Sequence, residues 1–429
     1  MKPVEEHLAE CLAAVAELEP EPTALLDALD CVLAEDVASP VDLPGFDNSA
    51  MDGFAVRLPD VLGAAEDRPV VLDVVADLAA GARPDVALTP GGAARIMTGA
   101  AVPEGTDAVV PVEWTGAATP GQGPGDRGGF AAGRHGADRV EVRRAPGGGQ
   151  FVRRAGEDVR RGEVVLTAGT RLTPRHVALL AAVGRAQVLV RRAPRVAVLS
   201  SGSELVEPGR PLGPGQVYES NGYGITAAVL ELGAQAHRVG AVADDAATLL
   251  RVIRDRVASA DLVVTSGGVS AGAYDTVKEV LRGLGTVRFD KVAMQPGMPQ
   301  GFGTVDGDGG RSVPIFTLPG NPVSARVSFE VFVRPVVRKM AGETSLHRHT
   351  VLAAATTGWA SPPGKRQFVR AVLHRADDGS RLVTPVGDQG SHLVADLAGA
   401  TCLAVVPEDV SAVRAGHEVR CMLLDRVRR

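Results

Sequence analysis

The stretch from Asp261 to Asp275, DLVVTSGGVSAGAYD, constrains the fold more than any other part of the chain. Its apolar run LVV is short and rich in β-branched residues, which is typical of a buried parallel strand. The run leads directly into TSGG, and a helical pattern begins near Tyr274. A strand, a glycine turn and a helix start together point backbone N–H groups at an anion. An ordinary strand–helix turn, with glycines for tight packing, explains the same residues equally well.

The residues around this stretch repeat its pattern of strands alternating with helices, from Arg195 to Gly342. Such alternation predicts a doubly wound α/β domain with a parallel sheet. Three polar turns, at 200–204, 265–270 and 319–324, follow the carboxyl ends of predicted strands. Ligands bind at this edge of open parallel sheets. We therefore expect the three turns to form one binding site.

The remaining segments predict further domains. Helical spacing of apolar residues predicts a helix over 4–18, and we expect a second helix over 23–29. A third helix is expected over 171–183, with Thr173 as its N-cap and Pro174 at its first position. Short alternating runs between 70 and 112, and again from 350 to the C-terminus, predict two small β domains. The Gly/Pro-rich residues 116–136 indicate a surface insertion.

Composition excludes several classes of protein. A chain of 429 residues with 45% hydrophobic and 22% charged residues is globular, and its length favours about three domains. A net charge of −6 argues against a nucleic-acid surface or a basic membrane patch. We find no apolar run of membrane-spanning length and no signal peptide, so we expect a cytoplasmic protein. The four cysteines are widely spaced and are expected to be reduced, small hydrophobic residues.

Carboxylates accompany the glycine turns, which indicates the class of chemistry. Acids and anion donors in one cleft favour a divalent cation that bridges phosphate and carboxylate. The sequence contains no P-loop motif, and no G-x-G-x-x-G opens a helix after a predicted strand with an acid following. The residues alone therefore predict metal-assisted phosphate or oxyanion chemistry, and they leave the reaction open. The acids concerned are Asp52, Asp158, Glu204, Asp244 and Asp275.

Six motifs in order give the chain a resemblance to a known family. They are FDNSAMDGFAV (46–56), RIMTGAAVPEGTDAVV (95–110), AGEDV (155–159), SSGSEL (200–205), TSGGVSAGAYD (265–275) and LPGNPVSA (318–325). With these motifs the chain resembles the molybdopterin molybdenumtransferase family, to which bacterial MoeA and the E domain of gephyrin belong. The resemblance covers nearly the whole chain.

The resemblance implies an elongated homodimer with four domains. Residues 1–44 and 157–192 would form a largely helical domain, into which a β domain of residues 45–156 is inserted. Residues 193–342 would form the α/β molybdopterin-binding domain, and 343–429 a small C-terminal β domain. It also implies a reaction, in which adenylated molybdopterin and molybdate, with Mg²⁺, give molybdenum cofactor and AMP. Other proteins of molybdenum cofactor biosynthesis are possible partners.

The resemblance also assigns roles to individual residues. The five acids named above, together with Lys291, would be the catalytic residues, and Asp244 and Asp275 would hold Mg²⁺. Only five of the 45 basic residues are lysine, so a lysine at 291 favours a role specific to its charge. The residues that would bind the pterin phosphate, the adenylate or molybdate are Thr98, Arg153, Ser266, Gly267, Gly268, Ser270, Pro319, Gly320, Asn321, Ser324, Arg366 and Ser391.

One departure from the family pattern keeps two alternatives open. The family commonly has K-P-G-K-P where this chain has Gln295 and Met298, so two ammonium groups near the expected oxyanion pocket are missing. Either molybdate binding is weak, or Arg366 and Lys291 replace the missing charges. The alternatives to an insertase are a non-catalytic cofactor-binding or scaffold relative, and a molybdopterin adenylyltransferase.

Overall fold

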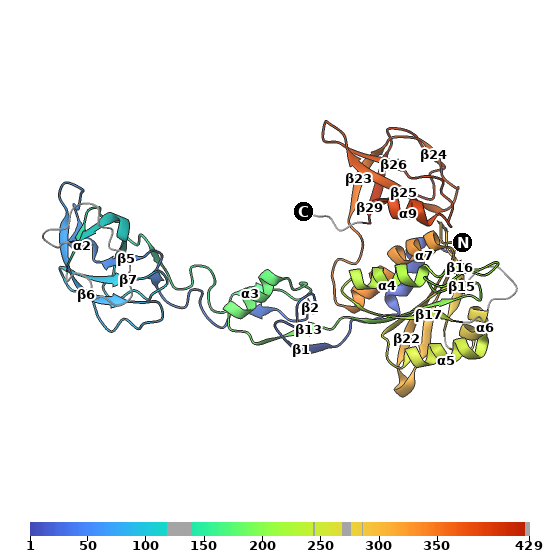
Figure 1. The fold of residues 1–429 in the computed structure, drawn as a ribbon, viewed down its shortest axis with the longest axis horizontal. Helices are drawn as coiled ribbons and strands as arrows, with labels where there is room; N and C mark the ends of the chain where they lie inside the picture. Colours follow the sequence, from blue (N-terminus) through green and yellow to red (C-terminus); the bar gives the residue numbers. More distant parts are fainter. Residues whose placement is uncertain (118–138, 243–244, 268–275, 285, 425–429) are drawn as a thin grey trace. The chain divides into compact units, whose positions relative to one another are not determined.

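The computed structural model describes residues 1–117, 139–242, 245–267, 276–284 and 286–424. The chain divides into two compact units, drawn in Figure 1. The first unit comprises residues 1–35, 168–173 and 187–429, and the second comprises residues 36–167 and 174–186.

A six-stranded sheet forms the centre of the first unit. In sheet order its strands are β17 (Gln235–Val242), β14 (Arg195–Ser201), β18 (Leu262–Ser266), β22 (Ser312–Leu318), β21 (Pro299–Asp306) and β19 (Arg288–Lys291). The first four strands pair in parallel, whereas β21 is antiparallel to both of its neighbours, β22 and β19. Helices α4 (Asn221–Glu231), α5 (Ala246–Val257) and α6 (Thr276–Arg282) alternate with the strands. The predicted doubly wound α/β domain is confirmed.

The strands are buried on both faces, because their side chains alternate between two hydrophobic cores. Val196, Val198 and Val264 pack into one core with α4 and the helix that closes the domain. Their neighbours in sequence, Ala197 and Val263, point to the opposite face and pack into the other core with α5 and α6. The run LVV thus serves both faces, as expected for a central parallel strand.

The closing helix of the α/β domain has three parts. Helix α7 (Pro322–Ser328) continues through a π-helical turn (Phe329–Val333) into α8 (Arg334–Met340). Pro335 lacks the N–H that would bond back to the preceding turn, which favours the wider turn at this point. On this helix Glu330 and Arg334 are buried, and Arg338 is half-buried.

The C-terminal residues form a closed barrel, which confirms the predicted small β domain. The sheet order is β20 (Met294–Gln295), β25 (Arg366–Arg375), β26 (Arg381–Pro385), β23 (Thr350–Ala355), β29 (Glu418–Leu423) and β27 (Cys402–Val406), and β25 also pairs with β27. Strands β24 (Trp359–Ala360) and β28 (Ala412–Val413) pair beside it, and α9 (Val394–Gly399) lies between β26 and β27 in sequence. Strand β20 belongs to the α/β domain in sequence, and so it ties the barrel to that domain.

The N-terminal segments contain more strand than the resemblance implies. Helix α1 (Val4–Ala13) is present, but the helix expected over 23–29 is not formed. Instead β1 (Pro20–Ala24) pairs with β13 (Gln187–Arg191), which pairs with β2 (Val32–Leu33). Pro20 and Pro22 cannot continue a helix, and β13 offers the segment a partner strand. The expectation of a largely helical domain is therefore wrong.

The second unit is mainly a β structure, as expected for residues 70–112. Its main sheet has the order β8 (Ala108–Pro111), β5 (Gly53–Val56), β7 (Gly92–Ile96), β6 (Val70–Leu78), β10 (Arg139–Val142) and β9 (Thr115–Ala117). Two further pairs join β4 (Asn48–Ser49) to β11 (Val152–Arg153) and β3 (Val37–Ala38) to β12 (Val164–Leu166). The short α2 (Leu58–Val61) follows β5, and α3 (Pro174–Ala182) begins at Pro174 as predicted.

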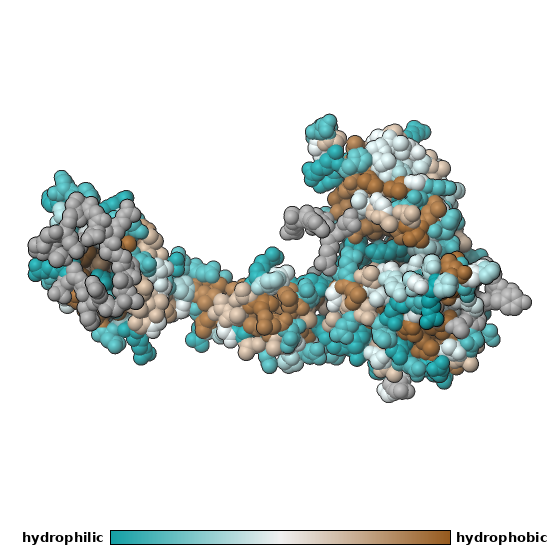
Figure 2. Space-filling view, in the orientation of Figure 1, coloured by the Kyte–Doolittle hydropathy of each residue, from teal (hydrophilic) through white to brown (hydrophobic). Residues whose placement is uncertain are grey.

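Other features agree with the composition. All four cysteines are free, and three of them are buried, whereas Cys31 is half-buried. Among the described residues, no helix has the length and apolar character to cross a membrane. Hydrophobic residues appear among hydrophilic ones on the face of the barrel seen in Figure 2, which is usual for a protein surface. The structure gives no test of the domain boundaries, which stay predictions.

Candidate functional site

In a doubly wound sheet the ligand crevice lies where successive connections leave one strand toward opposite sides of the sheet. Strand β14 has β17 on one side and β18 on the other, so the crevice opens at the carboxyl ends of β14 and β18. Ser200 of β14 and Ser266 of β18 are both buried there, with their Oγ atoms 3.1 Å apart. Two of the three predicted polar turns therefore meet.

Glu219 supports this serine pair. Its side chain is only 1% exposed, and Oε1 accepts hydrogen bonds from the Ser200 hydroxyl (2.9 Å) and from the Gly222 N–H (2.6 Å). The other carboxylate oxygen accepts a hydrogen bond from Arg238 at 3.2 Å. Glu219 was not predicted from the sequence. The only signal in the sequence was the polar triplet ESN, which ends at the first residue of α4 and is typical of a helix start.

Gly267 occupies a position that other residues would not tolerate. Its φ is +91°, and a Cβ atom would lie 2.6 Å from the backbone oxygen of Ser201. The N–H of Gly267 donates to the carbonyl of Leu318 at 3.1 Å. This glycine is required by its left-handed backbone and by its close approach to the backbone of Ser201, which fits the anion-site interpretation and plain tight packing equally.

The third polar turn, Pro319 to Asn321, joins the same edge. Asn221, at the start of α4, donates to the carbonyl of Gly320 at 2.7 Å. Asn321 donates through Nδ2 to the hydroxyl of Ser391 at 2.7 Å, so a loop of the barrel reaches this turn. Ser324 follows on α7 and is 5% exposed. The structure therefore brings five predicted residues together: Pro319, Gly320, Asn321, Ser324 and Ser391.

Four predicted residues lie outside the residues that the structure describes. They are Asp244, Gly268, Ser270 and Asp275. Both acids that were expected to hold Mg²⁺ are among them. Glu204 is described, and it lies exposed in the turn after β14.

Of the two cations expected to replace the missing lysines, Arg366 is already paired with carboxylates and Lys291 is exposed. Arg366 pairs with Glu5 and, at 3.0 Å, with Glu408. Burial opposes its charge, but these hydrogen bonds outweigh burial and raise the pKa of Arg366. Lys291 is exposed at the end of β19.

Of the two residues that replace the family lysines, Gln295 lies on the strand that pairs with the strand of Arg366. Gln295 is exposed on β20, which pairs with β25 so that Met294 is opposite Arg366. Met298 is half-buried, and its carbonyl accepts a hydrogen bond from Val292 at 2.8 Å. Because Arg366 is already bound to two carboxylates, it does not supply an additional unpaired cation at this point.

The second unit carries the remaining predicted residues. Asp52 accepts two hydrogen bonds on Oδ1 from Thr98, one from its N–H at 2.7 Å and one from its hydroxyl at 2.8 Å. Arg153 is exposed on β11, opposite Asn48. Asp158 is exposed and lines an open hollow of about 600 Å³. Asp52 and Thr98 thus form one hydrogen-bonded pair.

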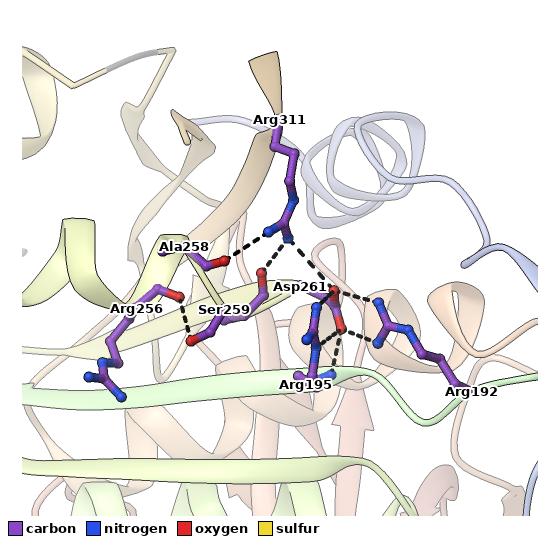
Figure 3. A network of polar contacts seen from close by, with 8 residues as sticks. Arg192, Arg195, Arg256, Ala258, Ser259, Asp261 and Arg311 are labelled. Carbon is purple, nitrogen blue, oxygen red and sulfur yellow. Dashed lines mark hydrogen bonds and ion pairs between the residues drawn. The ribbon is translucent and has the colours of Figure 1, made fainter. Parts of the chain in front are cut away.

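Asp261, which begins the stretch singled out above, has a structural role. Figure 3 shows Arg192, Arg195 and Arg311 directed at its carboxylate. Arg192 donates two hydrogen bonds to it at 2.6 and 2.8 Å. Burial opposes the charge of Asp261, but the hydrogen bonds from Arg192 and Arg195 hold its pKa below the usual range. This acid therefore fixes the amino end of β18.

One group of side chains in the described residues is compact enough to hold a metal ion. His7, Glu10 and Asp290 have ligand atoms within 4.8 Å of one another. The ammonium of Lys2, however, donates to Glu10 at 2.8 Å and to Asp290 at 2.6 Å. A lysine thus already supplies the cation at this point.

Comparison with known proteins agrees with the architecture. Residues 2–184 match the MoeA N-terminal region (domain I and II), residues 197–339 a probable molybdopterin binding domain, and residues 353–424 the MoeA C-terminal region (domain IV). A molybdopterin molybdenumtransferase 2 from Mycobacterium tuberculosis is 44% identical, over 98% of this chain and 99% of the relative.

More distant relatives match over similar lengths. A molybdopterin molybdenumtransferase from Bacillus subtilis is 34% identical, over 98% of this chain and 94% of the relative. The crystal structure of the molybdopterin biosynthesis MoeA protein from Pyrococcus horikosii is similar with a TM-score of 0.79 and 31% identity, over 99% of each chain. The chain therefore belongs to the molybdopterin molybdenumtransferase family.

Proposed function

We propose that this chain inserts molybdenum into adenylated molybdopterin and releases AMP, as a cytoplasmic homodimer. The observation that carries the proposal is the meeting of three polar turns at one sheet edge, in a chain that matches its relatives along their whole length. This edge is where an open parallel sheet binds phosphate-bearing ligands. Further proteins of molybdenum cofactor biosynthesis are proposed as partners that exchange substrate and product with it.

The chain's own residues position the anionic substrate. Gly267 lets the backbone approach a phosphate, and the Ser266 hydroxyl can donate to it. Glu219 holds Ser200, and Ser200 contacts Ser266, so the serine pair is fixed before substrate arrives. Asn321 and Ser391 would form the side of the pocket that takes molybdate. Molybdate is a substrate of the proposed reaction.

Mg²⁺ belongs to the proposal as a cation that offsets the charges of phosphate and carboxylate. Its proposed ligands are Asp244 and Asp275, which lie outside the described residues. The described carboxylate nearest the serine pair, Glu219, is already bound to Ser200, Gly222 and Arg238. It therefore positions other groups and is not proposed as a metal ligand.

The direct test is to incubate purified protein with adenylated molybdopterin, Mg²⁺ and molybdate. We expect release of AMP together with formation of active molybdenum cofactor. If neither forms at molybdate concentrations that saturate a known relative, the chain is a cofactor-binding or scaffold protein. If the protein instead makes adenylated molybdopterin from molybdopterin and ATP, it is an adenylyltransferase.

A matched pair of variants tests the proposed site itself. Glu219 and Glu207 both bind Arg238, but only Glu219 also holds Ser200. We expect Glu219→Gln to lower the rate of AMP release at least about tenfold, because small displacements of positioning groups have large effects on rate. Glu207→Gln should change the rate less than about twofold. Equal effects of the two variants would contradict the proposed role of the serine pair.

Gln295 and Met298 stand where the family commonly has lysines, and the loss of these two charges predicts weak molybdate binding. A charge-assisted hydrogen bond to a buried anion contributes about 1.5–3 kcal/mol. We expect the double variant Gln295→Lys with Met298→Lys to lower the molybdate concentration for half-maximal rate by at least about tenfold. An unchanged concentration would mean that other residues already supply the charge.

A further inference from the structure

A second cavity lies in the first unit, away from the candidate site. Its volume is about 940 Å³, and it is lined by the C-terminal end of α4, by α8 and by the segment 344–350 that leads into the barrel. The candidate site lies at the opposite end of α4, and that helix of 11 residues is roughly 16 Å long. The cavity is therefore separate from the proposed substrate pocket.

Two of the arginines that line the cavity are fully engaged with protein partners. Arg348 is buried and binds Glu330 at 2.8 Å and Glu231 at 3.2 Å. Arg171 donates to Glu343 at 2.5 Å and to the carbonyl of Leu232 at 3.1 Å. These ion pairs hold the cavity wall in place.

Arg334 is different, because two of its buried guanidinium nitrogens have no hydrogen-bond acceptor among the described residues. The residue is only 7% exposed, and Nε and Nη1 have no hydrogen-bond partner among the residues that the structure describes. The nearest carboxylate, Glu330, is 3.8 Å from Nη1. Burial and the nearby Arg348 lower the pKa of Arg334 to about 10.

A second arginine adds to the surplus of donors. Arg338 pairs with Glu343 through Nη2, but its Nε has no partner within the described part of the chain. Burial lowers the pKa of Arg338 as well. Both residues are on α8, one helical turn apart, so they lie on the same face of the helix.

The charges around the cavity do not balance. Four arginines line it, at 171, 334, 338 and 348, against three carboxylates, at 30, 231 and 343, which leaves one positive charge in excess. Glu330 and Arg326 are not among the lining residues and pair with each other at 2.8 Å, so they do not alter the sum. Buried guanidinium N–H groups without acceptors are costly. An anion with several oxygens would offset this charge and would offer acceptors to the guanidinium groups that line the cavity.

We propose that this cavity binds a small molecule carrying a phosphate- or sulfate-like oxyanion, held by Arg334 and Arg338. A guanidinium fork matches two oxygens of such a group. The cavity is larger than an inorganic ion needs, so it also accommodates a phosphate monoester. The site does not depend on the proposed reaction at the sheet edge, and it takes a different ligand.

The test is calorimetric titration of the full chain at constant ionic strength, with inorganic phosphate, sulfate and glycerol phosphate as separate ligands. We expect saturable binding of at least one of them with one site per chain. Arg334→Gln should weaken that binding at least tenfold, and Arg334→Lys should weaken it less, because the ammonium keeps the charge and loses the fork. Tighter binding of glycerol phosphate than of phosphate would identify a phosphate ester as the ligand.

Arg311→Gln is the matched control. Arg311 belongs to the Asp261 network in the same unit, and it already donates to the carbonyls of Ala258 and Ala260. This variant should bind the oxyanion with wild-type affinity.

If Arg334→Gln does not fold, Arg338→Gln replaces it as the test variant, with the same expected direction. Absence of saturable binding to the wild-type chain at up to about 10 mM ligand, or equal weakening by the control, would overturn the proposal.

Discussion

Two buried carboxylates in the first unit, Asp261 and Glu330, are each surrounded by three arginines, but their surroundings differ. At Asp261 the side chains of Arg192 and Arg195 are 32% and 43% exposed, so they are partly open to water. At Glu330 the side chains of Arg334 and Arg348 are only 9% and 5% exposed.

The difference shows that the number of ion pairs is a poor guide to their effect. The Asp261 network is complete, because each arginine finds either protein oxygens or water. The Glu330 network is incomplete, because one carboxylate is shared by three arginines and two donors of Arg334 have no hydrogen-bond partner among the described residues. Burial raises the pKa of Glu330, but Arg348 and its neighbours outweigh burial and keep its pKa low.

The largest effect is expected for Glu330→Gln. This change leaves three arginines without their shared carboxylate, and the side chains of Arg334 and Arg348 are only 9% and 5% exposed. Breaking a buried ion pair by removing one partner costs about 3–5 kcal/mol. We expect a loss of that size in the free energy of unfolding, measured by urea denaturation. A loss below about 1 kcal/mol would show that the cluster is hydrated in solution.

Asp261→Asn should have a smaller effect, although Asp261 accepts more hydrogen bonds. Its arginine partners are partly exposed and can be hydrated when the charge is removed. We expect a loss of about 1.5–3 kcal/mol, the range for hydrogen bonds to charged groups. The same urea measurement tests it, and a loss equal to that of Glu330→Gln would show that exposure of the arginines does not matter.

The pH dependence of stability should distinguish Asp261 from its uncharged replacement. The pKa of Asp261 is lower in the folded chain than in the unfolded chain. Its contribution to the free energy of unfolding is therefore complete above about pH 4 and is lost as the pH falls further. The stability difference between wild type and Asp261→Asn should therefore shrink by about 1–2 kcal/mol on acidification below pH 4. Urea midpoints measured at pH 5 and pH 3 test this, and a constant difference would contradict the low pKa.

The comparison also shows what the sequence could reveal. Strand–turn–helix patterns predicted the α/β sheet and placed Ser266, Gly267 and Asn321 at one edge, because these features are local in sequence. Asp52 and Thr98 are 46 residues apart, yet both were found because each lies in a conspicuous motif.

The parts that sequence did not reveal depend on contacts between distant segments. Glu219 looked like a residue before a helix, and its bond to Ser200 is visible only once β14 and α4 are packed. The strand β1 forms because β13 pairs with it, more than 160 residues later. The arginine cavity likewise joins residues from α4, α8 and the barrel linker, and no motif marks it.

The smallest effect, with the opposite sign, is expected for Arg334→Met. Methionine keeps an apolar stem of similar length and removes an unsatisfied buried charge, while Arg326 and Arg348 still neutralise Glu330. Replacing poorly paired buried charges with apolar residues is often neutral or stabilising. Without added oxyanion we expect a change between zero and a gain of about 1 kcal/mol in the free energy of unfolding. With saturating phosphate the wild type should become the more stable chain, because only it binds the anion. A loss above about 2 kcal/mol without phosphate would mean that Arg334 is already satisfied, and the contrast between the two carboxylate clusters would then disappear.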